Sequence, residues 1–156
     1  MERIDLDRLL RRAVFFAGLN LVGEEDELDF VPIFVIVDAM SRLRAEIVPY
    51  EGPEEFNAGL AAFGQRMRGD HVRAYAFVMS VRWPPTHALT NERPGEYIEA
   101  AQTTVAATAT DGFNSRSAEW TLRRDPDGII SGLDRREVVT ERLEDMFPLP
   151  KLGGTA

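Results

Sequence analysis

The sequence contains no cysteine, only two histidines and a single lysine among its 156 residues. Without cysteine there are no disulfides, no thiolate nucleophiles and no Cys-based metal sites. His71 and His87 lie sixteen positions apart, so neither an HExxH nor an HxH spacing brings two imidazoles onto one metal. The GxSxG, Walker A and GxGxxG motifs are also absent from the sequence, which argues against α/β-hydrolases and nucleotide-dependent enzymes. The sequence therefore predicts no catalytic residue, no metal site and no cofactor.

Positive charge is scarce as well, because 18 Lys and Arg residues stand against 26 Asp and Glu residues, for a formal net charge of −8. Nucleic-acid affinity depends on clustered basic side chains, so this balance argues against a DNA or RNA partner. The longest apolar run, residues 30–37, is far shorter than the roughly 20 residues of a membrane-spanning helix. Charged residues also interrupt any signal-peptide pattern at the N-terminus. We therefore expect a cytoplasmic protein without membrane spans.

The clearest pattern in the sequence is three antiparallel strands between residues 72 and 124. Strand 72–83 is apolar on both faces, one small and one bulky, which is typical of a central strand covered above and below. Strand 96–110 is rich in alanine and threonine, so we expect its sheet surface to receive a helix or a second subunit. Asp111 and Gly112 predict a two-residue hairpin loop. In the third strand, Glu119 lies on the face that we expect to contact water.

Two longer helices are predicted on either side of a hairpin. Apolar residues that include Leu19 recur at helical spacing over residues 5–21, and their stripe should be buried. Residues 53–69 form the second helix, with proline at its start and glycine at its end. Gly59 and Gly64 each lower the stability of that helix by roughly 1 kcal/mol relative to alanine. We therefore expect a neighbouring backbone or strand to approach both glycines closely.

The remaining elements are shorter. Residues 30–37 and 43–48 predict a hairpin, since both are strand-like and five residues join them. A turn at 125–128 leads to a short strand. Residues 135–146 then predict a short helix with Val138 facing inward.

Together these elements predict an α+β fold in the order α-β-β-α-β-β-β-α. Its core is a mainly antiparallel sheet of five or six strands, with two longer helices and a short C-terminal helix. Length and composition fit a single domain over residues 1–147. Residues 148–156 are expected to form a flexible C-terminal tail.

The longest irregular stretch, residues 84–95, is the candidate contact surface, because long structured loops often carry function. A polar loop without any ligand is the alternative interpretation. The predicted partner-binding residues in and beside this loop are Trp83, His87, Glu92, Arg93 and Tyr97.

One catalytic hypothesis survives the motif search. Asp38 follows the strand at 30–37 and Glu46 lies on the next strand, so two carboxylates could hold Mg²⁺ as in part of the restriction-endonuclease or RNase H pattern. The first pattern places a lysine beside its acids, whereas the lysine of this chain is Lys151. The second requires further acids on a helix and a later strand. An Mg²⁺-dependent nuclease using Asp38 and Glu46 is kept as the alternative function.

The segments AYAFVMSVRW and RPGEYIEAAQTTVAATATDG resemble small bacterial and phage-encoded proteins without an assigned activity. In those proteins an aromatic-ended strand precedes a Pro-rich loop and a long strand closed by Asp-Gly. The resemblance covers the middle third of the chain. It implies a phage or mobile-element accessory protein, and it transfers no catalytic residue.

Acidic charge and the lack of catalytic motifs favour a non-catalytic accessory or regulatory factor that binds another protein. A partner with a basic surface would complement the charge. A homodimer through the Ala/Thr-rich sheet surface is compatible with this hypothesis.

Overall fold

The computed structural model describes residues 4–24, 32–48, 53–83, 102–140 and 142–152. Its elements confirm the predicted α+β class and their order, with a sixth strand before the last helix. They are α1 (Leu6–Leu21), β1 (Ile33–Val37), β2 (Leu43–Ile47), α2 (Pro53–Gly69), β3 (Ala74–Trp83), β4 (Gln102–Thr110), β5 (Ser115–Arg124), β6 (Ile130–Arg135) and α4 (Leu143–Met146).

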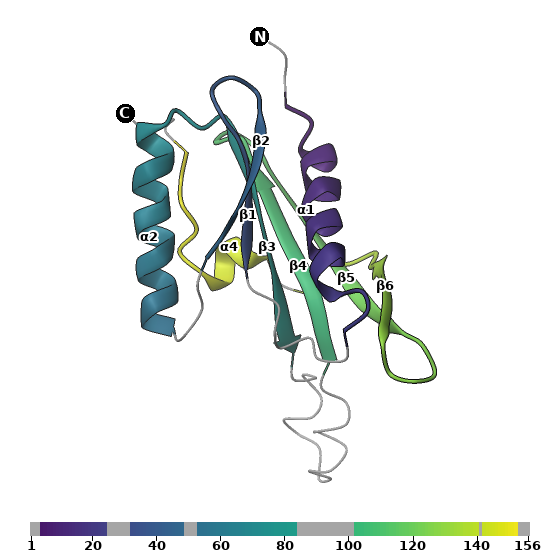
Figure 1. Cartoon of the computed structure of the whole chain (residues 1–156). Helices are drawn as coiled ribbons and strands as arrows, with labels where there is room; N and C mark the ends of the chain where they lie inside the picture. The colour runs from purple at the N-terminus through teal and green to yellow at the C-terminus, as the bar shows by residue number, and fades with distance from the viewer. Residues whose placement is uncertain (1–3, 25–31, 49–52, 84–101, 141, 153–156) are drawn as a thin grey trace.

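The strands form one six-stranded sheet in the order β2-β1-β3-β4-β5-β6 (Figure 1). Every neighbouring pair is antiparallel. Strands adjacent in sequence are also adjacent in the sheet, except that α2 carries the chain from β2 past β1 to β3. Within the described residues, β2 and β6 are therefore the two edges of the sheet.

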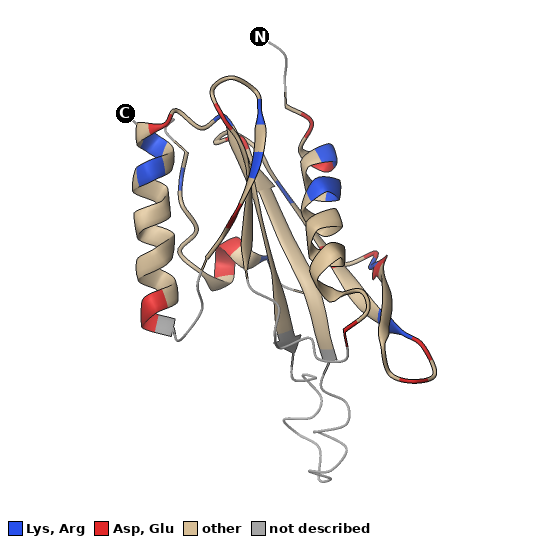
Figure 2. Cartoon of the chain, in the orientation of Figure 1, with Lys and Arg blue, Asp and Glu red and all other residues tan. Residues whose placement is uncertain are grey.

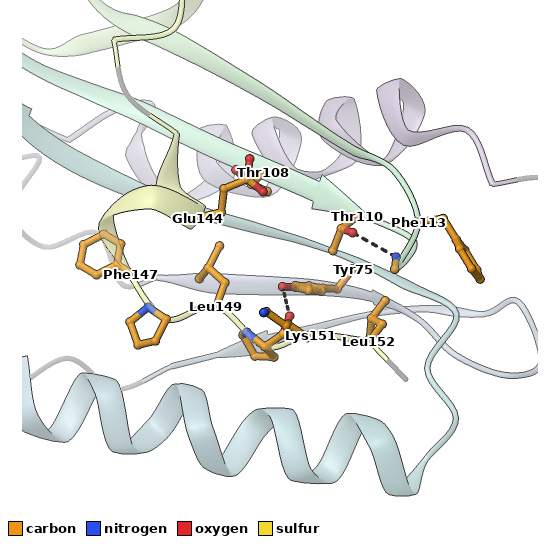
Figure 3. A pocket seen from close by; sticks show the side chains of 12 residues that line it. Tyr75, Thr108, Thr110, Phe113, Glu144, Phe147, Leu149, Lys151 and Leu152 are labelled. Carbon is orange, nitrogen blue, oxygen red and sulfur yellow. Dashed lines mark hydrogen bonds between the residues drawn. The ribbon is translucent and has the colours of Figure 1, made fainter. Parts of the chain in front are cut away.

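The two long helices lie on opposite faces of this sheet (Figures 1 and 3). On the α2 face, the ring of Phe34 stacks on Phe63 with centroids 4.2 Å apart, and Phe77 lies opposite Phe34 in the ladder. Because side chains alternate along a strand, the small residues of β3 point to the opposite face, toward α1. Helix α1 packs mainly on β4 and β3. Tyr75 and Ala76, which point to opposite faces, are both buried. The predictions of a two-sided central strand and of a helix over the alanine-rich strand are confirmed.

One of the two glycines of α2, Gly64, marks a close approach, as predicted. A Cβ built on Gly64 would lie 3.1 Å from the Cβ of Pro150, and one built on Gly59 would lie 3.4 Å from Cγ1 of Val48. The first distance is shorter than ordinary van der Waals contact, so a side chain at Gly64 would push against the C-terminal segment. Glycine therefore lets α2 sit close to its neighbour at Gly64, whereas a Cβ at Gly59 would make an ordinary van der Waals contact.

The loop between β4 and β5 has four residues rather than the predicted two, since Thr110 pairs with Ser115. Oδ1 of Asp111 accepts the backbone N–H groups of Phe113 and Asn114 at 2.9 and 2.8 Å. Gly112 has a φ of 91°, the left-handed conformation that glycine adopts at little cost. The pair Asp-Gly shapes the turn as expected, but the carboxylate organises two further residues.

The predicted helix at 135–146 is wrong over most of its length. Of its described residues, only Leu143–Met146 are helical, and β6 extends to Arg135. Val138, expected to face inward, is 71% exposed. Glu119, expected on a wet face, is completely buried. The two errors share one cause, because the segment after β6 folds over Glu119 and covers it.

Candidate functional site

The loop that the sequence favours as a contact surface falls outside the described residues. Trp83 is the last residue of β3, and its backbone pairs with Gln102, so the two ends of the intervening segment start from neighbouring strands. The loop's role in partner binding stays a prediction. The candidate residues that lie between these ends, outside the described part of the chain, are His87, Glu92, Arg93 and Tyr97.

Asp38 closes the β1–β2 hairpin. Its Oδ1 accepts the backbone N–H groups of Met40 and Arg42 at 2.8 and 2.9 Å, and its Oδ2 accepts Nε of Arg42 at 3.2 Å. The hydrogen bond from the Arg42 backbone is the main reason why the pKa of Asp38 lies below its ordinary value. Hydrogen bonds to the ionised form favour it. This carboxylate therefore serves the turn.

Glu46 is held in a separate set of ion pairs on β2. Its Oε1 lies 3.2 Å from Nε of Arg44, and its Oε2 lies 3.2 Å from the Arg66 guanidinium of α2. Asp38 is hydrogen-bonded to Arg42. Arg42 precedes Glu46 by four residues, which corresponds to about 13 Å along the strand. Two ligands of one Mg²⁺ must each lie about 2 Å from the ion. The arrangement of Asp38 and Glu46 gives the nuclease hypothesis no support.

The other described acidic and histidine side chains give a metal site no support either. Among the described residues, no group of three or more His, Cys, Asp or Glu side chains could hold a metal ion.

Residues 147–152, the C-terminal strap, cross the α2 face of the sheet (Figure 3). The hydroxyl of Tyr75 donates a hydrogen bond to the carbonyl of Pro150. Leu152 is buried, and its Cβ lies 3.3 Å from where a Cβ on Gly112 would be. The described part of the segment predicted as a flexible tail is thus packed on the sheet, while the mobility of residues 148–156 stays a prediction.

A cavity of about 380 Å³ lies between the strap and the sheet, with Tyr75, Thr108 and Glu144 in its wall (Figure 3). Burial raises the pKa of Tyr75, and the nearby negative charge of Glu144 raises it further. A raised pKa keeps this hydroxyl neutral and a poor base at physiological pH. Tyr75 is therefore a hydrogen-bond donor to the strap, and it does not have the lowered pKa of an activated nucleophile.

Glu119 anchors the segment after β6. Its carboxylate accepts the Thr140 N–H at 2.7 Å, the Thr140 hydroxyl at 3.1 Å and the Arg136 guanidinium at 2.9 Å, and its carbonyl accepts the Arg136 N–H at 2.8 Å. A buried carboxylate requires such partners, because losing water costs several kcal/mol. The chain itself supplies them all. Glu119 is therefore a structural anchor, and a second cavity of about 530 Å³ lies beside it at Thr140 and Arg142.

The outward side of α1 carries the largest exposed apolar group on any helix of the described chain. Phe15, Leu19 and Val22 are 56%, 65% and 48% exposed, although Leu19 was expected in the buried stripe. The spacings of four and three place them on one side of the helix, opposite the residues that pack on the sheet. Basic residues lie in the N-terminal half of the same helix (Figure 2), and their side chains are exposed. The α1 outer face consists of Arg8, Arg11, Arg12, Phe15, Leu19 and Val22.

Within the described residues, no helix has both the length and the apolarity to cross a membrane. Comparison of the chain with protein-family models, with curated proteins and with solved structures gives no match.

Proposed function

We propose that the protein is a non-catalytic accessory or regulatory factor that binds another protein through the α1 outer face. The observation that carries this proposal is the row formed by Phe15, Leu19 and Val22, each about half exposed or more. Aromatic and large aliphatic side chains grouped in this way are typical of protein-binding surfaces. The opposite side of the same helix is fixed on the sheet, so the row is presented on a rigid element.

The charges beside the row favour an acidic segment of the partner. Arg8, Arg11 and Arg12 are exposed in the N-terminal half of α1. A partner helix or strand that carries apolar side chains next to carboxylates would complement both halves of the surface. The net charge of −8 favoured a basic partner. Exposed charges act over about 8 Å at physiological salt, so the local arginines determine the contact.

The hydrogen bonds of the carboxylates and of Tyr75 support a role without catalysis. Asp38 is bonded to the hairpin turn, Glu46 to arginines of β2 and α2, and Glu119 to the segment after β6. Tyr75 donates to the strap. Each group serves the fold. A cytoplasmic location and a phage or mobile-element origin belong to the proposal, the latter on the strength of the resemblance in the middle third of the chain.

Affinity purification with mass spectrometry, run in parallel on four forms of the protein, tests the proposal. Wild type should retain one stoichiometric partner, and the double variant Phe15→Ser/Leu19→Ser should lose it. Met40→Ser is the matched control, because Met40 is 72% exposed but lies on the β1–β2 hairpin. Reversing the charge with Arg8→Glu and Arg11→Glu should weaken retention at low salt. A partner that all variants retain equally would refute the proposal.

A further inference from the structure

The edge strand β2 leaves one row of backbone groups open. Its N–H and C=O groups alternate in direction along the strand. Two backbone hydrogen bonds identify the residues whose backbone groups face β1. The Asp38 N–H donates to the Arg42 carbonyl, and the Val48 N–H donates to the Pro32 carbonyl. Even-numbered residues of this segment therefore point their backbone groups at β1. The residues that point them outward, with no backbone partner elsewhere in the described chain, are Leu43, Ala45 and Ile47.

The side chains of β2 also leave one face open. Leu43 and Ile47 are 48% and 65% exposed, and Ala45 between them is exposed too. These three side chains lie on the α1 face of the sheet, since Ala45 pairs with Val35 and Val35 pairs with Ala76. However, α1 packs on β1, β3, β4 and β5, and has no comparable contact with β2. As far as the described residues go, an uncovered apolar strip thus runs along an unpaired edge.

We propose that a second copy of this chain pairs with β2 in antiparallel orientation, with the two-fold axis at Ala45. The two six-stranded sheets would then join into one continuous sheet across the two copies. Backbone geometry fits this register, because Ala45 lies opposite its own copy and Leu43 lies opposite Ile47 of the second copy. All of these residues point their N–H and C=O groups outward, as hydrogen-bonded antiparallel pairs require.

The side chains of the strand are complementary to themselves in the same register. On one face, Leu43 lies against Ile47 of the second copy. On the other face, Arg44 lies against Glu46 of the second copy, at the separation of directly opposed residues where opposite charges attract. The sequence Leu-Arg-Ala-Glu-Ile is thus self-complementary under two-fold symmetry about its central alanine. This symmetry is the reason to identify the occupant of the edge as a second copy.

Neighbouring registers are disfavoured. A shift of two residues in one direction places Arg44 opposite Arg44, and a shift in the other direction places Glu46 opposite Glu46. Like charges directly opposite one another are destabilising. Within one chain, Arg44 also lies 3.4 Å from Asp70, and Glu46 lies 3.2 Å from Arg66. Pairing in the proposed register would extend these contacts into one network of alternating charge across both copies.

Size-exclusion chromatography with light scattering, over a wide range of protein concentration, tests this proposal. Wild type should approach twice the mass of the 17.5 kDa chain as concentration rises. Ala45→Pro should remain monomeric, because proline removes the central outward N–H while the bonds between β1 and β2 are kept. Circular dichroism establishes that the variant is folded. A wild type that stays monomeric at its highest soluble concentration, or a folded Ala45→Pro that still dimerises, would overturn the proposal.

A charge exchange tests the register independently of any effect of proline on folding. Glu46→Arg should lower dimer affinity at least tenfold, because it places arginines opposite one another. The double variant Arg44→Glu/Glu46→Arg should restore the dimer, since the opposed pairs again have opposite charge. Met40→Ser and Phe15→Ser/Leu19→Ser should dimerise like wild type. Failure of the double variant to recover the dimer refutes the register, and loss of the dimer in Phe15→Ser/Leu19→Ser moves the interface to α1.

Discussion

The two edges of the sheet differ in how they meet their surroundings. β2 is regular over its five residues, exposed almost throughout, and apolar on one face. β6 pairs with β5 through a register shift at Arg123 and Arg124. The guanidinium of Arg123, a residue of β5, occupies the space beside Gly132 of β6 and lies 2.7 Å from Oδ1 of Asp134, also on β6. Proteins commonly protect edge strands with irregular pairing and charged groups.

The contrast indicates that β6 terminates the sheet and that β2 is able to extend it. At β6 the chain continues past the strand and fastens to β5 through Glu119. At β2 the chain continues into α2 on one face and leaves the other face open.

The largest expected effect is on the β6 side. Glu119→Ala leaves the Arg136 guanidinium and the Thr140 N–H without their carboxylate partner. Removing one member of a buried ion pair costs about 3 kcal/mol of unfolding free energy. Urea unfolding followed by circular dichroism measures the change. A loss below about 1 kcal/mol would be typical of a surface pair and would contradict the anchoring role.

The second prediction makes β2 resemble a protected edge. Leu43→Lys/Ile47→Lys places positive charges on the exposed strip, as natural edge strands often do. Dimer affinity should fall at least tenfold because like charges approach across the interface. The unfolding free energy of the monomer should change by less than about 0.5 kcal/mol, since both positions are solvent-exposed. Sedimentation velocity and urea unfolding, used together, separate the two quantities. Equal dimerisation of variant and wild type would show that the apolar strip does not contribute.

The third prediction concerns the hairpin that presents β2. The pKa of Asp38 is lowered in the folded state, so its contribution to stability is complete above the unfolded value, near 3.9. It is lost as the pH falls through the lower folded pKa. The melting temperature of Asp38→Asn should therefore lie below that of wild type at pH 7. The difference should shrink as the pH is taken below 4. A difference that stays constant down to the acid range would assign the effect to something other than the carboxylate charge.

The smallest expected effect is at the exposed ion pair of β6. Arg123 and Asp134 are both more than half exposed at 2.7 Å separation. Asp134→Ala should cost less than about 1 kcal/mol, and raising the salt concentration should reduce that cost further. Thermal unfolding at low and high salt measures both. A larger, salt-independent loss would mean that this pair is a structural part of the edge.

The sequence was sufficient to predict the elements whose signals are local. Pro53 and Gly69 mark the ends of α2, Gly112 and Gly128 have the positive φ of the predicted turns, and the apolar pattern of β3 places that strand centrally. It also predicted the close approach at Gly64. Each of these signals lies within a few residues of the structure it specifies.

Tertiary contacts explain the errors. The alternation of polar and apolar residues along β5 predicted that Glu119 contacts water. Residues seventeen and more positions later fold over it instead. The same contacts hold that segment out of the helix that its apolar spacing predicts. Leu19 fits the apolar spacing of α1, but α1 has apolar residues on more than one side, and only the packed structure distinguishes them. The symmetry of β2 can be read from the sequence, but it indicates pairing with a second copy only once β2 is known to be an edge strand.

The C-terminal strap has a consequence for how the chain folds. Tyr75 is in the middle of the sheet, but its hydroxyl reaches a carbonyl 75 residues further along, and Leu152 rests against the β4–β5 loop. A nascent chain emerging from the ribosome thus lacks this part of the cover of its central strand until residues 150–152 have been made. Deletions just after Phe147 should accordingly reduce the yield of folded protein, whereas a tag attached further downstream should be tolerated.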